Sequence, residues 1–379
     1  MRILVDYEGV PGNYTGVPRA IHDDALSLLS AGFYVTLWMN KRTSALVEPF
    51  ELCNEKENYD LRRLSIDFTR PSNSSLWVTQ GFEREIYKRH DVTLTSLFPA
   101  IGMPNRRLIR MHDPVGHTGK MLREFFLFDG RLKLILARGL RNAAYIRNIK
   151  ESITIPSSDF ISSKLNSIYS SKGVRIHKIP CAVGSGTLED NYKPSKRENY
   201  FLIIGGLRQR KRPDITINTW AENYKSLKVN LIVVGDIPNT ALTPKALELR
   251  SKGILKLVSQ IHTSRLRELQ KNALVCIFVS EGEGFGRPIA ESLLVGTPVI
   301  CNDLKVFEEF THNNVRKFSL DHPQELLNLM HSYVVPISNE ERLDILKYGK
   351  TFSYESVGEK WRDLILNLEL QKPNNSRNF

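Results

Sequence analysis

The sequence predicts an α/β protein of two Rossmann-like domains, each with a doubly wound parallel sheet. The chain has 379 residues, which is long for one domain and comfortable for two. Apolar, strand-like runs alternate with segments of helical period in both halves, and this alternation is typical of a parallel sheet covered on both faces. A polar segment rich in Gly, Ser, Lys and Pro separates the two series and predicts a linker over residues 184–199.

The first domain is expected over residues 1–183 and opens with a strand–helix–strand unit. A short apolar strand is predicted over residues 3–5, followed by a Gly-rich loop over 9–18. Helical spacing predicts a helix over 19–30, which ends at Gly32, and a second strand follows over 33–38. The alternation continues less clearly to about residue 180.

The second domain is expected over residues 200–350, where the alternation is clearer. Strands are predicted over 200–204, 229–234, 254–258, 274–279 and 298–301, and helices over 213–224, 263–272 and 288–295. A C-terminal helix over 351–371 is expected to cross back to the first domain, and the polar residues 372–379 to form a disordered tail. Ligands of open α/β sheets bind at the carboxyl ends of the strands, so two such domains predict a central cleft that these ends face.

Composition limits the class of protein. Hydrophobic residues make up 41% and charged residues 25%, as in soluble globular proteins. The formal net charge of +12 favours a polyanionic partner, such as nucleic acid, an anionic membrane or phosphorylated small molecules, although a generally basic surface also accounts for it. We find no zinc motif and no basic patch interleaved with aromatic residues, so nucleic acid is not expected as a partner.

The sequence also predicts a cytoplasmic location. No apolar run reaches the length of a membrane span, and Asp6 interrupts the first apolar run, so we expect no signal peptide. The cysteines lack the spacing of a metal or redox clip, and we expect reduced core thiols. They are Cys53, Cys181, Cys276 and Cys301.

The most informative stretch has the sequence SEGEGFGRPIAE, from Ser280 to Glu291. It follows a buried strand and opens a predicted helix, and a Gly-rich loop at a helix N-terminus is an anion site. Glu291, one turn inside the helix, can accept hydrogen bonds from ribose hydroxyls, and Glu283 on the loop can do the same for a sugar. Three glycines let the backbone approach a ligand closely: Gly282, Gly284 and Gly286.

The pair Glu283 and Glu291, set in E-G-F-G-x-P-x-x-E, resembles the signature of retaining glycosyltransferases of the large glycogen-synthase-like family four. These are group 1 glycosyltransferases of the bacterial surface-polysaccharide type. The resemblance implies a GT-B fold, with two Rossmann-like domains facing a central cleft, and a nucleotide-diphosphate sugar as donor. It also implies that the loop and helix contact the donor through Glu283, Gly284, Phe285, Gly286 and Glu291.

A second match, I-G-G-L-R-Q-R-K-R-P, follows the first strand of the second domain. It resembles the family segment in which a lysine binds the donor diphosphate, and Lys211 falls on that lysine. The resemblance also implies that Gly206 lies at the donor. Gly206 stands where the family often has an arginine, so Arg208 or Arg210 is expected to supply the second cationic contact. A solvated basic turn is the alternative interpretation of the segment.

A third match lies near the N-terminus, where T-G-V-P-R over residues 15–19 resembles the family's T-G-I-G-R loop. The resemblance implies that Gly16 brings backbone amides toward the β-phosphate and the transferred sugar. Pro18 replaces the second glycine, and a simple turn fits the segment equally well.

The fourth match is R-M-H-D-P over residues 110–114, which resembles the family's strand-ending H-D dipeptide. The resemblance implies that His112 contacts the transferred sugar at the reaction centre and that Asp113 orients the loop.

The implied reaction needs no cofactor and no metal ion. The sequence has no D-x-D triplet and no Cys/His cluster at ligand spacing. Lys211, neighbouring arginines and a helix dipole would then neutralise the leaving diphosphate. The resemblance implies retention of the anomeric configuration and gives the catalytic roles to His112, Glu283 and Lys211. With no evident nucleophile on the opposite sugar face, a front-side path is expected.

The implied acceptor is a saccharide or a lipid-linked saccharide in cell-surface polysaccharide synthesis. The basic segment over residues 131–150 can lie on an anionic membrane, which would give a peripheral contact at the inner face, or it can pack on its own sheet. Two other functions stay open: a sugar-nucleotide epimerase on the same fold, and a non-catalytic subunit that binds a sugar nucleotide.

Overall fold

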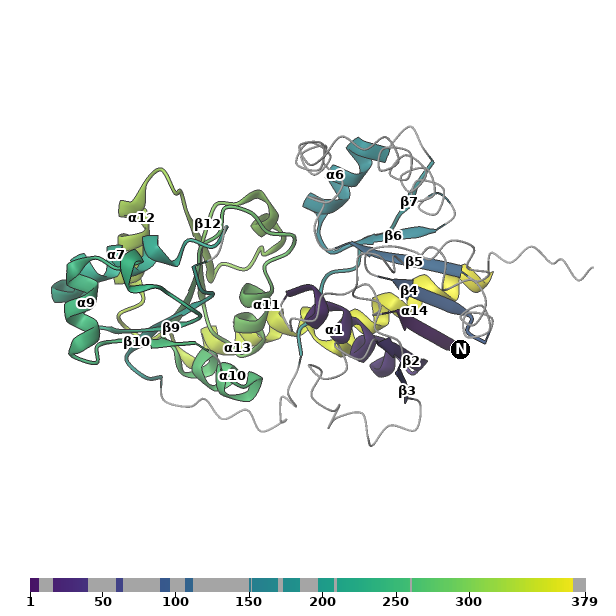
Figure 1. Ribbon diagram of the computed structural model, residues 1–379, viewed down its shortest axis with the longest axis horizontal. Helices are drawn as coiled ribbons and strands as arrows, with labels where there is room; N and C mark the ends of the chain where they lie inside the picture. The colour runs from purple at the N-terminus through teal and green to yellow at the C-terminus, as the bar shows by residue number, and fades with distance from the viewer. Residues whose placement is uncertain are drawn as a thin grey trace, which may run out of the picture. The chain divides into compact units, whose positions relative to one another are not determined.

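The computed structural model describes residues 1–6, 16–39, 59–63, 89–95, 106–111, 150, 152–169, 173–184, 197–207, 210–259 and 261–370. The chain forms two compact units, Met1–Ala182 with Tyr354–Phe379, and Val183–Ser353. In Figure 1 the first unit carries the purple and teal strands and the yellow C-terminal helix, and the second is green. Both are α/β units, which confirms the predicted fold class. A cleft between them stays a prediction.

The first unit is built on a seven-stranded sheet in the order β3-β2-β1-β4-β5-β6-β7. All its strand pairs are parallel. The helix α1 (Gly16–Ser30) connects β1 to β2, and α6 (Asp159–Tyr169) connects β6 to β7. The strands are β1 (Arg2–Asp6), β2 (Tyr34–Met39), β3 (Tyr59–Arg63), β4 (Val92–Thr95), β5 (Arg106–Met111), β6 (Ile153–Pro156) and β7 (Arg175–Ile176).

The last helix, α14 (Tyr354–Leu370), completes the first unit by packing along α1. Figure 1 shows the yellow helix beside the purple one. A Cβ on Gly358 would lie 2.5 Å from the carbonyl oxygen of Ser27, so only glycine allows this close approach. The Tyr354 hydroxyl donates to Asp23 at 2.6 Å. The C-terminal helix is therefore part of the core that begins at residue 1.

A buried ion pair lies in this core. Arg110 of β5 and Asp24 of α1 are both fully buried, with Nε and Oδ2 separated by 2.8 Å. The same guanidinium donates to the carbonyl of Pro180 at 2.9 Å and lies over the ring of Trp361, 5.5 Å from its centroid. Arg110, the first residue of the fourth motif, therefore joins the sheet, α1 and α14.

The second unit has a six-stranded sheet in the order β10-β9-β8-β11-β12-β13, with every pair parallel. Its strands are β8 (Tyr200–Ile204), β9 (Asn230–Val234), β10 (Leu255–Val258), β11 (Val275–Phe278), β12 (Val299–Asn302) and β13 (Val315–Phe318). Its α-helices are α7 (Pro213–Glu222), α8 (Tyr224–Leu227), α9 (Pro244–Ser251), α10 (Thr263–Asn272), α11 (Arg287–Leu294), α12 (Pro323–Ser332) and α13 (Asn339–Gly349). Short 3-10 turns are η4 (Asn239–Ala241), η5 (Lys305–Glu309) and η6 (Lys350–Phe352).

The end of the predicted linker belongs to the second unit. Arg197 is buried and donates hydrogen bonds to the carbonyl of Ala273, the carbonyl of Gly296 at 2.6 Å and the hydroxyl of Thr297 at 3.2 Å. Gly184, at its beginning, accepts a hydrogen bond from Arg267 at 2.9 Å. Residues 185–196 lie outside the described residues, as do the predicted tail at 372–379 and all of the basic segment except Lys150.

The described cysteines confirm the expected core thiols. Cys181, Cys276 and Cys301 are free and buried, whereas Cys53 lies outside the described residues. Burial raises the pKa of the Cys276 and Cys301 thiols to about 12, so both stay protonated at neutral pH.

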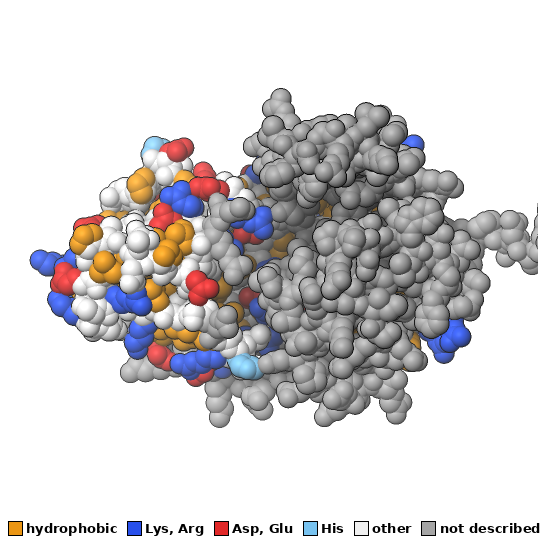
Figure 2. Space-filling model, in the orientation of Figure 1, with side chains coloured by type: hydrophobic (Ala, Val, Ile, Leu, Met, Phe, Trp, Pro, Cys, Tyr) orange, Lys and Arg blue, Asp and Glu red, His pale blue; other side chains and the backbone are white. Residues whose placement is uncertain are grey.

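Among the helices that the structure describes, none combines the length and the apolar character needed to span a lipid bilayer. On the face of the second unit visible in Figure 2, basic and acidic side chains are interspersed. On this face, the excess of positive charge does not gather in a single patch.

Candidate active site

Two of the sequence motifs meet at the carboxyl ends of neighbouring strands. The strands β8 and β11 are parallel partners, and each is followed by a motif loop and a helix. Lys211 and Ser280 form an antiparallel bridge between the two loops. The Glu281 amide donates to the Arg210 carbonyl at 2.7 Å, and the Arg212 amide donates to the Val279 carbonyl at 3.2 Å. Segments about 70 residues apart in sequence are therefore joined through their backbones.

The Lys211 side chain is held along the end of the sheet. Its Nζ lies 5.2 Å from the centroid of the Phe278 ring, at the last residue of β11. A Cβ on Gly205 would lie 2.8 Å from Lys211 Cδ, and Gly205 has a φ of +131°. Glycine at 205 thus leaves the space through which the lysine stem passes, and the ammonium group is fixed at the edge where ligands of such sheets bind.

Backbone packing explains why position 206 is a glycine, and the sequence alone did not indicate this. A Cβ at this position would lie 2.6 Å from the backbone nitrogen and 2.7 Å from the carbonyl oxygen of Asp236, in the loop after β9. The amide of Leu207 donates to that same carbonyl at 2.9 Å. The family's arginine does not fit this backbone, so the contact of Gly206 with a donor stays a prediction.

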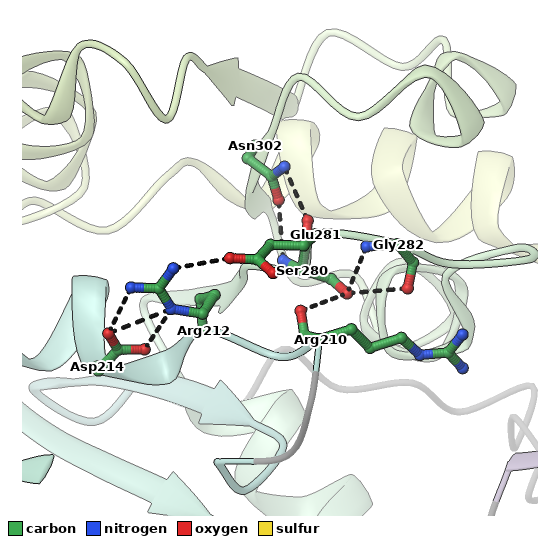
Figure 3. Close-up of polar contacts among 7 residues, drawn as sticks. All are labelled: Arg210, Arg212, Asp214, Ser280, Glu281, Gly282 and Asn302. Carbon is green, nitrogen blue, oxygen red and sulfur yellow. Dashed lines mark hydrogen bonds and ion pairs between the residues drawn. The ribbon is translucent and has the colours of Figure 1, made fainter. Parts of the chain in front are cut away.

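The arginines that flank Lys211 in the sequence differ in their surroundings. Arg212 donates to Asp214 at 2.9 Å and to Glu281 at 2.7 Å, and Figure 3 shows it between the two carboxylates. The hydrogen bonds that Arg212 donates to the carboxylates of Asp214 and Glu281 raise the pKa of its guanidinium above its already high value. Arg210 is exposed, and its side chain extends away from this cluster in Figure 3. Arg208 lies outside the described residues.

The Glu283 loop is tied to the sheet by a residue that the sequence did not single out. Asn302, the last residue of β12, accepts from the Ser280 amide and donates to the Ser280 carbonyl, both at 3.0 Å. The Ser280 hydroxyl in turn lies 3.2 Å from Oε1 of Glu283. One sequence signal could have identified Asn302. It is a polar residue at the end of an apolar strand, and that strand follows the glutamate motif along the chain.

Phe285 anchors the loop through its side chain. It is 4% exposed and packs against Phe310 and Phe352, with ring centroids 5.3 and 5.8 Å apart. The predicted donor contact of Phe285 can therefore involve its backbone alone. Gly284 is buried as well.

The helix α11 begins directly after this anchor. Gly286 caps it at a φ of +104°, and a Cβ there would lie 2.9 Å from the Phe307 ring. Glu291 lies one turn inside, and its Oε1 is 3.4 Å from the guanidinium of Arg287. Sequence reasoning predicted the position of Glu291 on the helix but missed its cationic partner.

The remaining predicted site residues lie elsewhere. Gly16 is the first residue of α1 in the first unit. His112 and Asp113 lie outside the described residues, and β5 before them ends at Met111. Within the described parts of the chain, no group of three or more His, Cys, Asp or Glu could hold a metal ion.

Comparison with known sequences places the site in a family segment. Residues 187–344 match the model for glycosyl transferases group 1. The O-antigen chain mannosyltransferase RfbU of Salmonella typhimurium is 28% identical over 153 residues, 39% of this chain and 42% of that protein. The serotype-specific mannosyltransferase WbdA of Escherichia coli is 28% identical over 138 residues, 35% of this chain and 17% of that protein. The chain thus matches less than half the length of these relatives.

Comparison with solved structures extends the likeness to the whole chain. A glycosyltransferase from Rickettsia africae superposes with a TM-score of 0.65 at 15% identity, over 98% of this chain and 99% of that one. WaaG, a glycosyltransferase involved in lipopolysaccharide biosynthesis, superposes with a TM-score of 0.62 at 16% identity, over 96% and 99%. At these identities the likeness shows the GT-B fold alone.

Proposed function

We propose that this chain, whose residues 187–344 match the model for glycosyl transferases group 1, moves a hexose from a nucleotide-diphosphate donor to a hydroxyl of a saccharide or lipid-linked saccharide. The observation that carries the proposal is the backbone bridge of Lys211 and Ser280, which joins the lysine loop to the loop of Glu283. The named relatives are mannosyltransferases, which makes mannose the first sugar to test.

The proposed donor lies with its diphosphate between Lys211 and the N-terminus of α11. Backbone amides and the helix dipole favour negative charge there, and the ammonium group adds a charge-assisted contact. Glu291 accepts hydrogen bonds from the ribose hydroxyls, and Glu283 accepts them from the transferred sugar. Arg208 or Arg210 contacts the phosphates, because Arg212 is already engaged by two carboxylates.

The proposed transfer proceeds with retention and without a metal ion. The bond between the anomeric carbon and the β-phosphate oxygen breaks, and its electron pair leaves with the phosphate. The acceptor oxygen forms the new bond on the same face, and its proton passes to the leaving phosphate. Lys211 stabilises the charge that grows on the leaving group.

The N-terminal contacts are proposed from the sequence motifs alone. His112 would contact the transferred sugar, and Gly16 would present backbone amides to the β-phosphate. We also propose a cytoplasmic enzyme of cell-surface polysaccharide synthesis, with a peripheral membrane contact where its acceptor is lipid-linked.

The test begins with binding. The melting temperature is measured with GDP-mannose, UDP-glucose and UDP-N-acetylglucosamine, since a ligand that binds the native state raises it. The donor so identified is then assayed for hydrolysis and for transfer to saccharide acceptors. Binding and transfer are expected. Binding without turnover would indicate a non-catalytic subunit, and conversion of the bound sugar to its epimer would indicate an epimerase.

A further inference from the structure

We propose that Ser280 and Asn302 are positioning residues that hold the carboxylate of Glu283 in place for glycosyl transfer. The inference rests on the proposed function, and it adds two residues that belong to neither the glutamate pair nor the lysine segment. It starts from the order of three strand ends in the second unit, where β11 lies between β8 and β12.

Asn302 extends the strand pairing with its side chain. The last paired residues of β11 and β12 are Phe278 and Cys301. Beyond them, the side-chain amide of Asn302 accepts a hydrogen bond from the backbone N–H of Ser280 and donates one to the backbone carbonyl of Ser280, each at 3.0 Å. Asn302 is 2% exposed and Ser280 is fully buried, so these peptide groups have no water to pair with. The Asn302 side chain therefore holds both the backbone N–H and the backbone carbonyl of Ser280.

The hydroxyl of Ser280 in turn contacts the carboxylate of Glu283. Its Oγ lies 3.2 Å from Oε1 of Glu283, 3.1 Å from the Gly282 carbonyl and 3.2 Å from the Arg210 carbonyl. A hydroxyl has one proton to donate, and a carboxylate oxygen is a stronger acceptor than either backbone carbonyl. The Gly282 amide approaches the same Oγ at 3.4 Å. The hydroxyl thus lies where the lysine segment, the glycine loop and the carboxylate meet.

The expected effect is specific to the sugar end of the donor. Glu283 is proposed to contact the transferred sugar, whereas the diphosphate is held by Lys211 and the α11 N-terminus. A displaced Glu283 should therefore slow transfer while the affinity for a nucleoside diphosphate alone stays unchanged. Small misplacements of a positioned group are costly in rate, because transfer needs a defined geometry.

The experiment uses the full chain and the sugar nucleotide that stabilises the wild type. Turnover is measured together with calorimetric Kd values for that donor and for its nucleoside diphosphate. Ser280→Ala is expected to lower turnover by about tenfold to a hundredfold, with the diphosphate Kd unchanged. Ser280→Cys places a somewhat larger thiol at the same position, and a thiol hydrogen-bonds only weakly, so this variant should lose nearly as much turnover.

Ser292→Ala is the matched control. The hydroxyl of this buried serine on α11 donates to the Pro288 carbonyl at 2.8 Å and accepts from the Gln270 side-chain amide at 3.3 Å, and neither partner is proposed to contact the donor, so turnover should equal that of the wild type. Asn302→Ala should behave like Ser280→Ala, with lower turnover and an unchanged Kd for the nucleoside diphosphate. Should Asn302→Ala fail to fold, the two Ser280 variants decide.

Wild-type turnover in Ser280→Ala and Ser280→Cys would overturn the inference while the proposed function stands. A parallel loss of turnover and of affinity for the nucleoside diphosphate would also overturn it, because that pattern indicates general damage to the loops. A wild-type chain that binds and turns over none of the sugar nucleotides would overturn the proposed function and this inference with it.

Discussion

The carboxylate of Glu291 lies 3.4 Å from the guanidinium of Arg287, one turn earlier on α11. The two side chains are only 11% and 12% exposed, so water screens the pair less than it would on an open surface. The contact with the arginine limits the orientation of the glutamate side chain. A hydrogen-bond acceptor is therefore already oriented at the place where the donor ribose is proposed to bind.

Removing this carboxylate should weaken donor binding. Glu291→Ala is expected to cost about 1.5–3 kcal/mol of donor affinity, the usual range for a hydrogen bond to a charged group. Calorimetry with the sugar nucleotide measures the loss. Glu248→Ala serves as control, since Glu248 also pairs with a residue four positions away but lies exposed on α9. Equal affinities in both variants would contradict the ribose assignment.

Lys211→Ala should lower turnover more than it weakens donor binding. Charge grows on the leaving phosphate during transfer, so the ammonium group acts more strongly on the transition state than on the bound donor. A loss of about a hundredfold or more in turnover is expected. Lys211→Arg should keep only part of the wild-type turnover, because the planar guanidinium of arginine differs in geometry from the compact ammonium group of lysine.

Steady-state kinetics and a separately measured donor Kd distinguish the two roles of Lys211. Lys245→Ala, at an exposed ion pair on α9, controls for the loss of one positive charge. If Lys211→Ala raises KM alone, the lysine merely holds the donor, and the leaving-group role passes to Arg208 or Arg210.

Activity should survive chelation. The basis is the lack of a D-x-D triplet in the sequence, together with the cationic and helix-terminus groups proposed for the diphosphate. Turnover is compared before and after dialysis against EDTA, and then with added magnesium or manganese. Loss with EDTA and recovery with either metal would show that the metal-free mechanism is wrong.

A side chain at position 206 should destabilise the second unit. In Gly206→Ala the new Cβ meets the backbone of Asp236 at 2.6 Å, and overpacking of this kind costs about 1–3 kcal/mol. Thermal unfolding measures the loss. Gly282→Ala is the matched control, because a Cβ there meets nothing within 4 Å. Equal melting temperatures would mean that the 235–236 loop moves aside at little cost.

Of the regular elements of the second unit, those with clear local signals at their ends could be predicted, whereas α9, β13, α12 and α13 were not. The strand at 200–204 and the helix at 263–272 have the expected bounds. The helix expected over 213–224 ends at Glu222 instead, where the Asn223 amide donates to the Trp220 carbonyl and the short helix α8 follows. A local sequence window cannot distinguish that cap from one more helical residue.

The site could be predicted only as far as its motifs reach. Lys211, Glu283 and Glu291 stand in recognisable spacing, but their partners depend on strand order and register. Asn302 contacts Ser280 because β12 lies beside β11, and Glu281 contacts Arg212 because β8 lies on the other side. Pairings of this kind arise from the fold of the sheet and leave no trace in local sequence.

The return of α14 to the first unit has a consequence for synthesis. Residues 183–353 form a continuous unit, so they can fold as soon as they leave the ribosome. The first unit is made earlier but has to wait for Trp361 and Gly358, which close its core against Arg110 and α1. Until then α1 exposes apolar surface, and the nascent first unit is the stage at which a chaperone would be needed.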